Sequence, residues 1–235
     1  MTEQQTAEKR TRSKVRNGGA LTTETSSNHG YEISPRKATP HFNRGELYRR
    51  FGQIQAAISE YRMAVQYNSN NPFYRYRLAD ALSEGGQTAQ GIFELEHASD
   101  LEPQNGFYHF LLSDHYARQG RLNEAILEMQ KATFFESEDS YYHVRLALLM
   151  LKLGCAQDAV QSLQVAVDLD PGNASYHCLL GDVYVRVGAE RQALMHYRHA
   201  GQLDSYDSAF VEKLRRLSNQ PHEREHINCR KGDKR

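Results

Sequence analysis

Histidines at a constant spacing are the residues of this sequence that most plainly suggest metal chemistry. His41, His109, His143 and His177 lie multiples of 34 residues apart, and Arg75 occupies the remaining place in the series. A zinc ion needs each ligand within about 2 Å, whereas packed helices lie about 8–10 Å apart. Residues a whole repeat apart therefore cannot share an ion. We interpret these histidines as packing residues with a polar edge, and we expect neither a metal nor another cofactor.

The other candidates for chemistry are few. His222, His226 and Cys229 cluster near the carboxyl end, but no second cysteine or acid follows at ligand spacing, so we expect only adventitious metal binding there. Cys155 opens a predicted helix, a position that can lower a thiol pKa, yet a single such cysteine is usually inert. The sequence holds no nucleophile elbow, phosphate loop, dinucleotide-binding glycine pattern or metalloprotease helix. We predict that the protein is not an enzyme.

The elements that must position these residues follow from a gapless repeat of 34 residues. A glycine recurs in every row, two small residues follow it, and a large side chain lies between the small ones. The four columns are Gly52, Gly86, Gly120, Gly154, Gly188; Ala57, Gly91, Ala125, Ala159, Ala193; Tyr61, Leu95, Met129, Leu163, Tyr197; and Ala64, Ala98, Ala132, Ala166, Ala200. Small residues let two helices approach closely, and a left-handed glycine ends a helix. Each row therefore predicts two antiparallel helices, with Gly91 costing about 1 kcal/mol of helix propensity.

This pattern resembles the tetratricopeptide repeat. The fifth row matches it most fully, through Leu180, Gly181, Tyr184, Gly188, Ala193, Tyr197 and Ala200, whereas Arg44 stands where the first row should have leucine. The resemblance covers five rows, 38–71, 72–105, 106–139, 140–173 and 174–207. It implies an all-α fold, a right-handed α-solenoid of helix-turn-helix repeats. Phe210, Val211, Leu214 and Leu217 predict a carboxyl-terminal capping helix over 208–218.

Charge divides the chain into an acidic body and two basic ends. Residues 1–37 carry seven basic and four acidic groups, 38–212 carry 14 and 22, and 213–235 carry eight and three. The sum is zero, which argues against a dedicated nucleic-acid binder. The polar composition of 1–37 and 219–235 predicts disordered arms.

Neither a membrane span nor a secretory signal is visible in the sequence. The longest apolar run, 146–151, is far shorter than the ~20 residues a spanning helix needs. The amino end has no apolar stretch behind its charges. With three irregularly spaced cysteines, the sequence predicts a reduced, cytoplasmic protein.

In the family that the sequence resembles, the second, fifth, ninth and twelfth residues of each row usually line a concave groove. The resemblance therefore implies a groove with an aromatic stripe beside a column of carboxylates. The aromatic residues are Phe42, Phe73, Tyr76, Phe107, Phe110 and Tyr141, and the carboxylates are Glu46, Asp80, Asp114 and Asp182. Packing against the neighbouring repeat is an alternative interpretation for Phe73 and Phe107.

The carboxylates differ in their neighbours along the helix. Arginines four residues on, Arg50, Arg118 and Arg186, are spaced to pair with Glu46, Asp114 and Asp182. Asp80 is instead followed by Glu84. Asp80 is therefore the carboxylate that we expect to be open to a cation of the ligand.

The expected function is that of a protein–protein interaction scaffold or adaptor, such as a co-chaperone or complex-assembly factor. Its partner would be a protein segment with apolar anchors and basic residues, complementary to the aromatic and acidic groove. The Lys and Asn with which some co-chaperones of this family clamp an acidic carboxyl terminus are absent. Two alternatives stay open, namely self-association into an oligomeric scaffold, and assembly of a membrane complex to which the basic arms recruit the protein.

Overall fold

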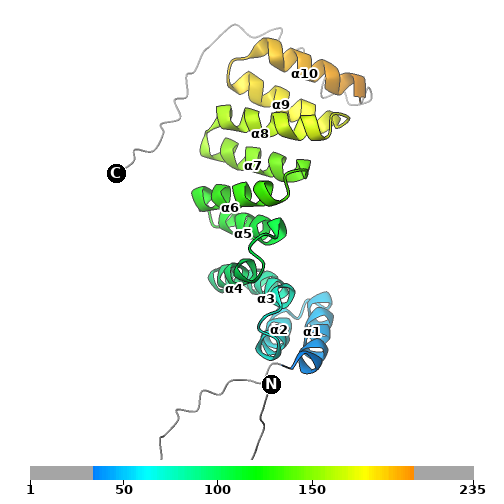
Figure 1. The fold of residues 1–235 in the computed structure, drawn as a ribbon, viewed down its shortest axis with the longest axis vertical. Helices are drawn as coiled ribbons and strands as arrows, with labels where there is room; N and C mark the ends of the chain where they lie inside the picture. Colours follow the sequence, from blue (N-terminus) through cyan, green and yellow to red (C-terminus); the bar gives the residue numbers. More distant parts are fainter. Residues whose placement is uncertain (1–33, 204–235) are drawn as a thin grey trace, which may run out of the picture. The chain divides into compact units, whose positions relative to one another are not determined.

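The computed structural model describes residues 34–203, and this part of the chain consists of ten α-helices without a strand (Figure 1). The helices are α1 (Pro35–Arg50), α2 (Ile54–Tyr67), α3 (Pro72–Glu84), α4 (Thr88–Leu101), α5 (Gly106–Arg118), α6 (Leu122–Phe135), α7 (Ser140–Leu153), α8 (Ala156–Leu169), α9 (Ala174–Arg186) and α10 (Glu190–Leu203). None of them is long and apolar enough to cross a membrane.

The helices form five hairpins that stack in chain order. Each odd-numbered helix packs most extensively against the even-numbered helix that follows it, and α2, α4, α6 and α8 also contact the next hairpin. Figure 1 shows this succession from α1, in blue, to α10, in orange. The prediction of an all-α solenoid is confirmed.

Local sequence explains where the helices begin and end. The side chains of Asn71, Asn105, Asp139 and Asn173 each accept a hydrogen bond from a backbone N–H in the first turn of α3, α5, α7 and α9. The glycines between the helices of each hairpin have φ between 71° and 87°, a left-handed conformation that is costly for residues with a Cβ. The predicted role of this glycine column is confirmed.

In the first and fifth hairpins, a buried tyrosine of the second helix packs against a glycine of the first helix. Tyr61 and Tyr197 are almost fully buried, and each ring lies against a glycine, Gly45 or Gly181, where an added Cβ would come within 2.7 Å of it. The three middle rows hold Ala or Ser at the glycine place and Leu or Met at the tyrosine place. A larger side chain on one helix thus faces a smaller residue on the other, which keeps the core closely packed.

Gly91 lies where α3 and α4 approach each other closely, with little room for an added side chain. An alanine Cβ there would lie 2.8 Å from the Ala79 carbonyl oxygen and 2.8 Å from Ser83 Oγ, because α3 and α4 cross at this point. Overpacking of this kind costs about 1–3 kcal/mol, against a propensity gain of about 1 kcal/mol. We therefore expect Gly91→Ala to lower the free energy of unfolding in urea by about 1 kcal/mol; a more stable variant would contradict this packing.

Several predicted features lie outside the described residues. These are most of the arm at 1–37, the capping helix at 208–218, the tail at 219–235 and the cluster of His222, His226 and Cys229. At the boundary, α1 begins at Pro35 rather than after residue 37, because proline at the first helical position is compatible with helix initiation.

Candidate docking face

The odd-numbered helices lie side by side, as contacts between their side chains demonstrate. Phe42 of α1 meets Phe73 of α3, Tyr76 of α3 meets Phe107 of α5, and Phe110 of α5 meets Tyr141 of α7, with ring centroids 5.6, 5.4 and 5.9 Å apart. Their surface, which we call the odd-helix face, brings the predicted groove residues together.

The aromatic stripe has an exposed layer and a supporting layer. Phe73, Phe107 and Tyr141, at the second place of their rows, keep 46, 38 and 46 % of their surface exposed. Phe42, Tyr76 and Phe110, at the fifth place, are half-buried beneath or beside them. Phe73 and Phe107 are therefore not sealed between the repeats, although each contacts a ring of the supporting layer.

The carboxylates at the amino-terminal end of this face are already paired, mostly with cations from a neighbouring repeat. Arg77 Nε donates to Glu46 at 2.6 Å, and Tyr61 Oη donates at 2.7 Å. Burial favours the neutral acid, but these donors outweigh it and hold the pKa of Glu46 below its usual value.

Asp80 differs from the expectation that it awaits a cation of the ligand. Arg49 of the preceding hairpin donates to Asp80 at 2.7 Å and also pairs with Glu84. The expectation considered only partners on the same helix, and it is wrong because the counter-charge comes from the neighbouring one. The hydrogen bond from Arg49 lowers the pKa of Glu84.

The two remaining carboxylates also have partners. Asp114 accepts from Arg118 at 2.6 Å, the predicted pair within one helix, and from Arg145 of α7 at 2.8 Å. Asp182 accepts from Tyr197 Oη at 2.6 Å. The expectation of a basic partner depends on free carboxylates in this column, and these contacts weaken that basis.

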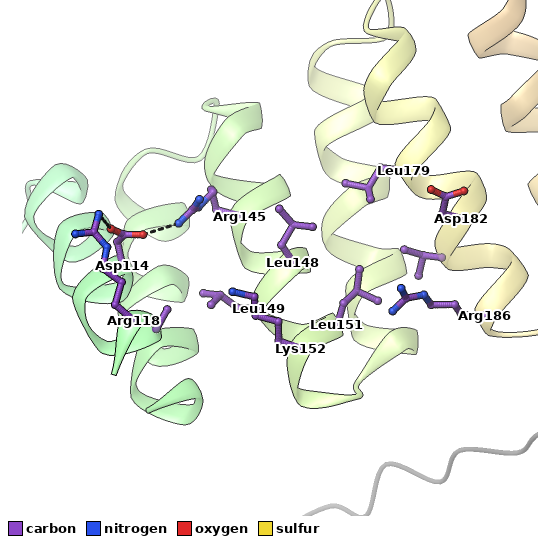
Figure 2. Close-up of a pocket in the computed structure, with 12 residues that line it drawn as sticks. Asp114, Arg118, Arg145, Leu148, Leu149, Leu151, Lys152, Leu179, Asp182 and Arg186 are labelled. Atoms are coloured by element: carbon purple, nitrogen blue, oxygen red, sulfur yellow. Dashed lines mark hydrogen bonds and ion pairs between the residues drawn. The ribbon is translucent and has the colours of Figure 1, made fainter. Parts of the chain in front are cut away.

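A cavity of about 520 Å³ opens on the odd-helix face between α5, α7 and α9. We call it the leucine pocket, because Leu148, Leu149, Leu151 and Leu179 form most of its apolar lining, with Ala117 and Val183. Its remaining lining residues are charged, namely Asp114, Arg118, Arg145, Lys152, Asp182 and Arg186. Figure 2 shows Asp114 bonded to Arg118 and Arg145, while Asp182 and Arg186 lie on α9.

The sequence contains the origin of this pocket. At the ninth and twelfth places, the first hairpin has Glu46 and Arg49, whose ion pairs link α1 to α3. The fourth hairpin has Leu148 and Leu151 at these two places. Arg145 and Leu179 occupy the sixth place of their rows, which the resemblance does not assign to the groove, whereas it does assign the ninth place.

The histidine column has a structural role that fits the interpretation as packing. His109 Nε2 lies 3.0 Å from the carbonyl oxygen of Pro103, and His109 Nδ1 lies 2.8 Å from Glu128 of the next helix. Arg75, the exception in the column, makes the same two kinds of contact, with Ser69 and Glu94. Each of these two side chains thus connects a carbonyl oxygen of the loop before its repeat to a glutamate on the second helix of the hairpin.

These features define an α-solenoid of stacked helical hairpins whose odd-numbered helices share one face. Two models described as tetratricopeptide repeat match residues 76–141 and 38–71, and one described as bacterial transcriptional activator domain matches 127–220. The chain belongs to the tetratricopeptide-repeat family. A search of proteins with curated functions finds no significant match.

Solved structures with a similar fold include two MamA proteins. A crystal structure of MamA is 17 % identical with a TM-score of 0.66, covering 75 % of this chain and 96 % of that one. MamA from Desulfovibrio magneticus RS-1 is 21 % identical with a TM-score of 0.63, covering 73 % and 98 %. YrrB, described as having an unusual peptide-binding site, is 16 % identical with a TM-score of 0.61, covering 76 % and 92 %. At these identities the likeness concerns the fold alone.

Proposed function

We propose that the protein is a scaffold that holds a segment of a partner protein against its odd-helix face, as an adaptor or complex-assembly factor. The observation that carries this proposal is the aromatic stripe, which runs across neighbouring helices while its outer rings stay exposed. Contiguous exposed apolar surface is rare on proteins without partners. Aromatic anchors supply much of the energy at protein interfaces.

Contacts among the rings of the aromatic stripe also favour docking. Phe73 and Phe107 each contact Tyr76, with centroids 5.8 and 5.4 Å apart, and Phe42 contacts Phe73 from the preceding helix. Rings held by one another lose little conformational freedom when a ligand covers them. The peptide-binding site in the description of YrrB is consistent with this use of the fold.

A second surface has support from its own exposed residues. Phe93 on α4, and Leu127 and Phe134 on α6, are 56, 57 and 77 % exposed. These residues lie on even-numbered helices, so a partner bound there would leave the aromatic stripe free. Self-association of the chain through this second surface is the competing proposal.

Selection of peptides from a displayed library against the full chain distinguishes the two surfaces. We expect the double variant Phe73→Ser with Phe107→Ser to bind the selected peptides at least about ten-fold more weakly. Truncation of a hot-spot residue costs about 1.4 kcal/mol of binding free energy or more, which corresponds to this factor. Titration followed by fluorescence anisotropy measures the change, and circular dichroism checks that the helices persist.

The matched control is Phe93→Ser with Phe134→Ser, which removes two exposed rings from even-numbered helices. The proposal expects this control to bind as the unmodified chain does. Loss of binding in the control alone, with the first variant unaffected, would transfer the function to the second surface.

A further inference from the structure

The leucine pocket combines an apolar lining with a surplus of positive charge. Arg118, Arg145, Lys152 and Arg186 contribute four cationic side chains, and Asp114 and Asp182 contribute two carboxylates. Both carboxylates have donors, as Asp114 is bonded to two arginines and Asp182 accepts from Tyr197. The pocket therefore presents more positive than negative charge to a ligand.

Among the four cations that line the pocket, Lys152 and Arg186 have no carboxylate partner within the described residues. Neither makes an ion pair with any residue between 34 and 203, and both side chains are exposed at the pocket. Arg118 and Arg145 share Asp114, so their charge is only partly neutralised. Carboxylates of a ligand would meet these side chains without displacing an existing pair.

The apolar residues of the pocket are open enough to be covered. Leu148 is 37 % exposed, and Leu151 and Leu179 are partly exposed beside it, whereas Leu149 and Val183 form a buried base. A volume of about 520 Å³ is within the range of ligand pockets. One or two large apolar side chains of a peptide would fill it.

The chain's own terminal segments do not suit this charge. Outside the described residues, positions 1–33 have a net charge of +1 and positions 204–235 a net charge of +2, so neither segment brings a surplus of negative charge. Like charges disfavour such an occupant. Charge complementarity therefore favours an acidic segment of another protein.

We propose that the leucine pocket binds an internal segment of a partner protein in which leucine or phenylalanine side chains are flanked by aspartate or glutamate. The apolar side chains occupy the space between α5, α7 and α9, and the flanking carboxylates meet Lys152 and Arg186. This inference rests on the proposed function, and it replaces the basic partner expected from the carboxylate column with an acidic one.

The test uses the full chain and three labelled peptides, capped at both ends, with the same two leucines flanked by glutamates, by glutamines or by lysines. We expect the glutamate peptide to bind tightest, with an affinity that falls as salt is raised. The double variant Lys152→Glu with Arg186→Glu is expected to bind the glutamate peptide about ten-fold more weakly or worse. It should bind the lysine peptide more tightly than the glutamate peptide.

Two further variants separate the pocket from general charge. Arg191→Glu with Arg198→Glu makes the same change of charge on exposed residues of α10, away from the pocket, and should leave the preference for glutamate unchanged. Leu148→Glu should abolish binding of the glutamate peptide while the circular dichroism spectrum stays that of the unmodified chain.

Equal or tighter binding of the lysine or glutamine peptide to the unmodified chain would overturn the inference. So would loss of binding in the α10 control, or failure of all three peptides to bind. The proposed function has its own test in the variants of Phe73 and Phe107, so it can survive each of these results.

Discussion

Replacing Tyr61 by alanine is expected to lower the free energy of unfolding by about 3–5 kcal/mol, the cost of deleting a fully buried aromatic side chain. The ring is 0 % exposed and packs between α1 and α2, and its hydroxyl donates to Glu46. Because each hairpin of a repeat protein contacts only its neighbours, the loss should concentrate in the first hairpin. Urea unfolding and hydrogen exchange of α2 measure it.

Tyr141→Ala is the matched control for that variant, because this tyrosine is 46 % exposed and its loss should change stability by less than about 1 kcal/mol. A loss below 1 kcal/mol for Tyr61→Ala would contradict the packing described for the first hairpin.

A double variant tests whether Gly45 and Tyr61 share one packing site. Gly45→Ala places a Cβ 2.6 Å from the Tyr61 ring. In the second row, the equivalent residues are Ala79 and Leu95, which lie in one core cluster. Gly45→Ala with Tyr61→Leu should therefore cost at least about 1 kcal/mol less than the sum of the single variants. Strict additivity would mean that the two residues do not share a site.

Lowering the pH from 7 to 5 is expected to destabilise the protein by about 2 kcal/mol through His196. Burial, and then the neighbouring His177 and His199, lower the pKa of His196 from 6.5 to about 4. The ring is 4 % exposed, its Nδ1 lies 3.0 Å from His177 Nδ1, and Tyr184 stacks on it. Below about pH 6.5, His196 is protonated in the unfolded chain but stays neutral in the folded chain. The free energy of unfolding therefore decreases as the pH falls.

His196→Gln tests this pH dependence, because glutamine does not titrate. We expect urea unfolding of the variant between pH 5 and 7 to depend less on pH than that of the unmodified chain. Burial also lowers the pKa of His115, which adds a loss of the same sign to both proteins and cancels in the comparison. Identical pH profiles would contradict the result.

His109 supplies a control of opposite sign. The hydrogen bond to Glu128 raises its pKa above 6.5 although burial opposes this. Its stabilising contribution is therefore present below about pH 6.5 and is lost as the pH rises through the raised pKa. His109→Gln should be most destabilising at the acid end of the range, whereas His196→Gln should be most protective there.

Local and periodic features of this fold could be predicted from the sequence. The glycine column fixes the left-handed turns, and the small and large columns fix the helix pairing, because both depend on residues within one row. The histidine column could be assigned to packing on geometric grounds. Within the candidate site, the aromatic stripe follows from the same register.

Contacts between rows were harder to predict. Arg77 pairs with Glu46, and Arg145 with Asp114, across 31 residues, so spacing within one helix reveals neither pair. Asp80 was misjudged for this reason. The leucine pocket depends on Leu148, Leu151 and Leu179 from two hairpins, and its free charge becomes visible only after the ion pairs around Asp114 are assigned.

We expect partners to bind across the odd-numbered helices. Photo-crosslinking of the full chain with a library-selected peptide that carries a benzophenone group locates the bound segment. Mass spectrometry of the crosslinked product should locate the attachment on α3, α5, α7 or α9, near Phe73, Phe107 or Leu148. Attachment near Phe93, Leu127 or Phe134 on α4 and α6, with the odd-numbered helices unlabelled, would show that partners do not bind on the odd-helix face.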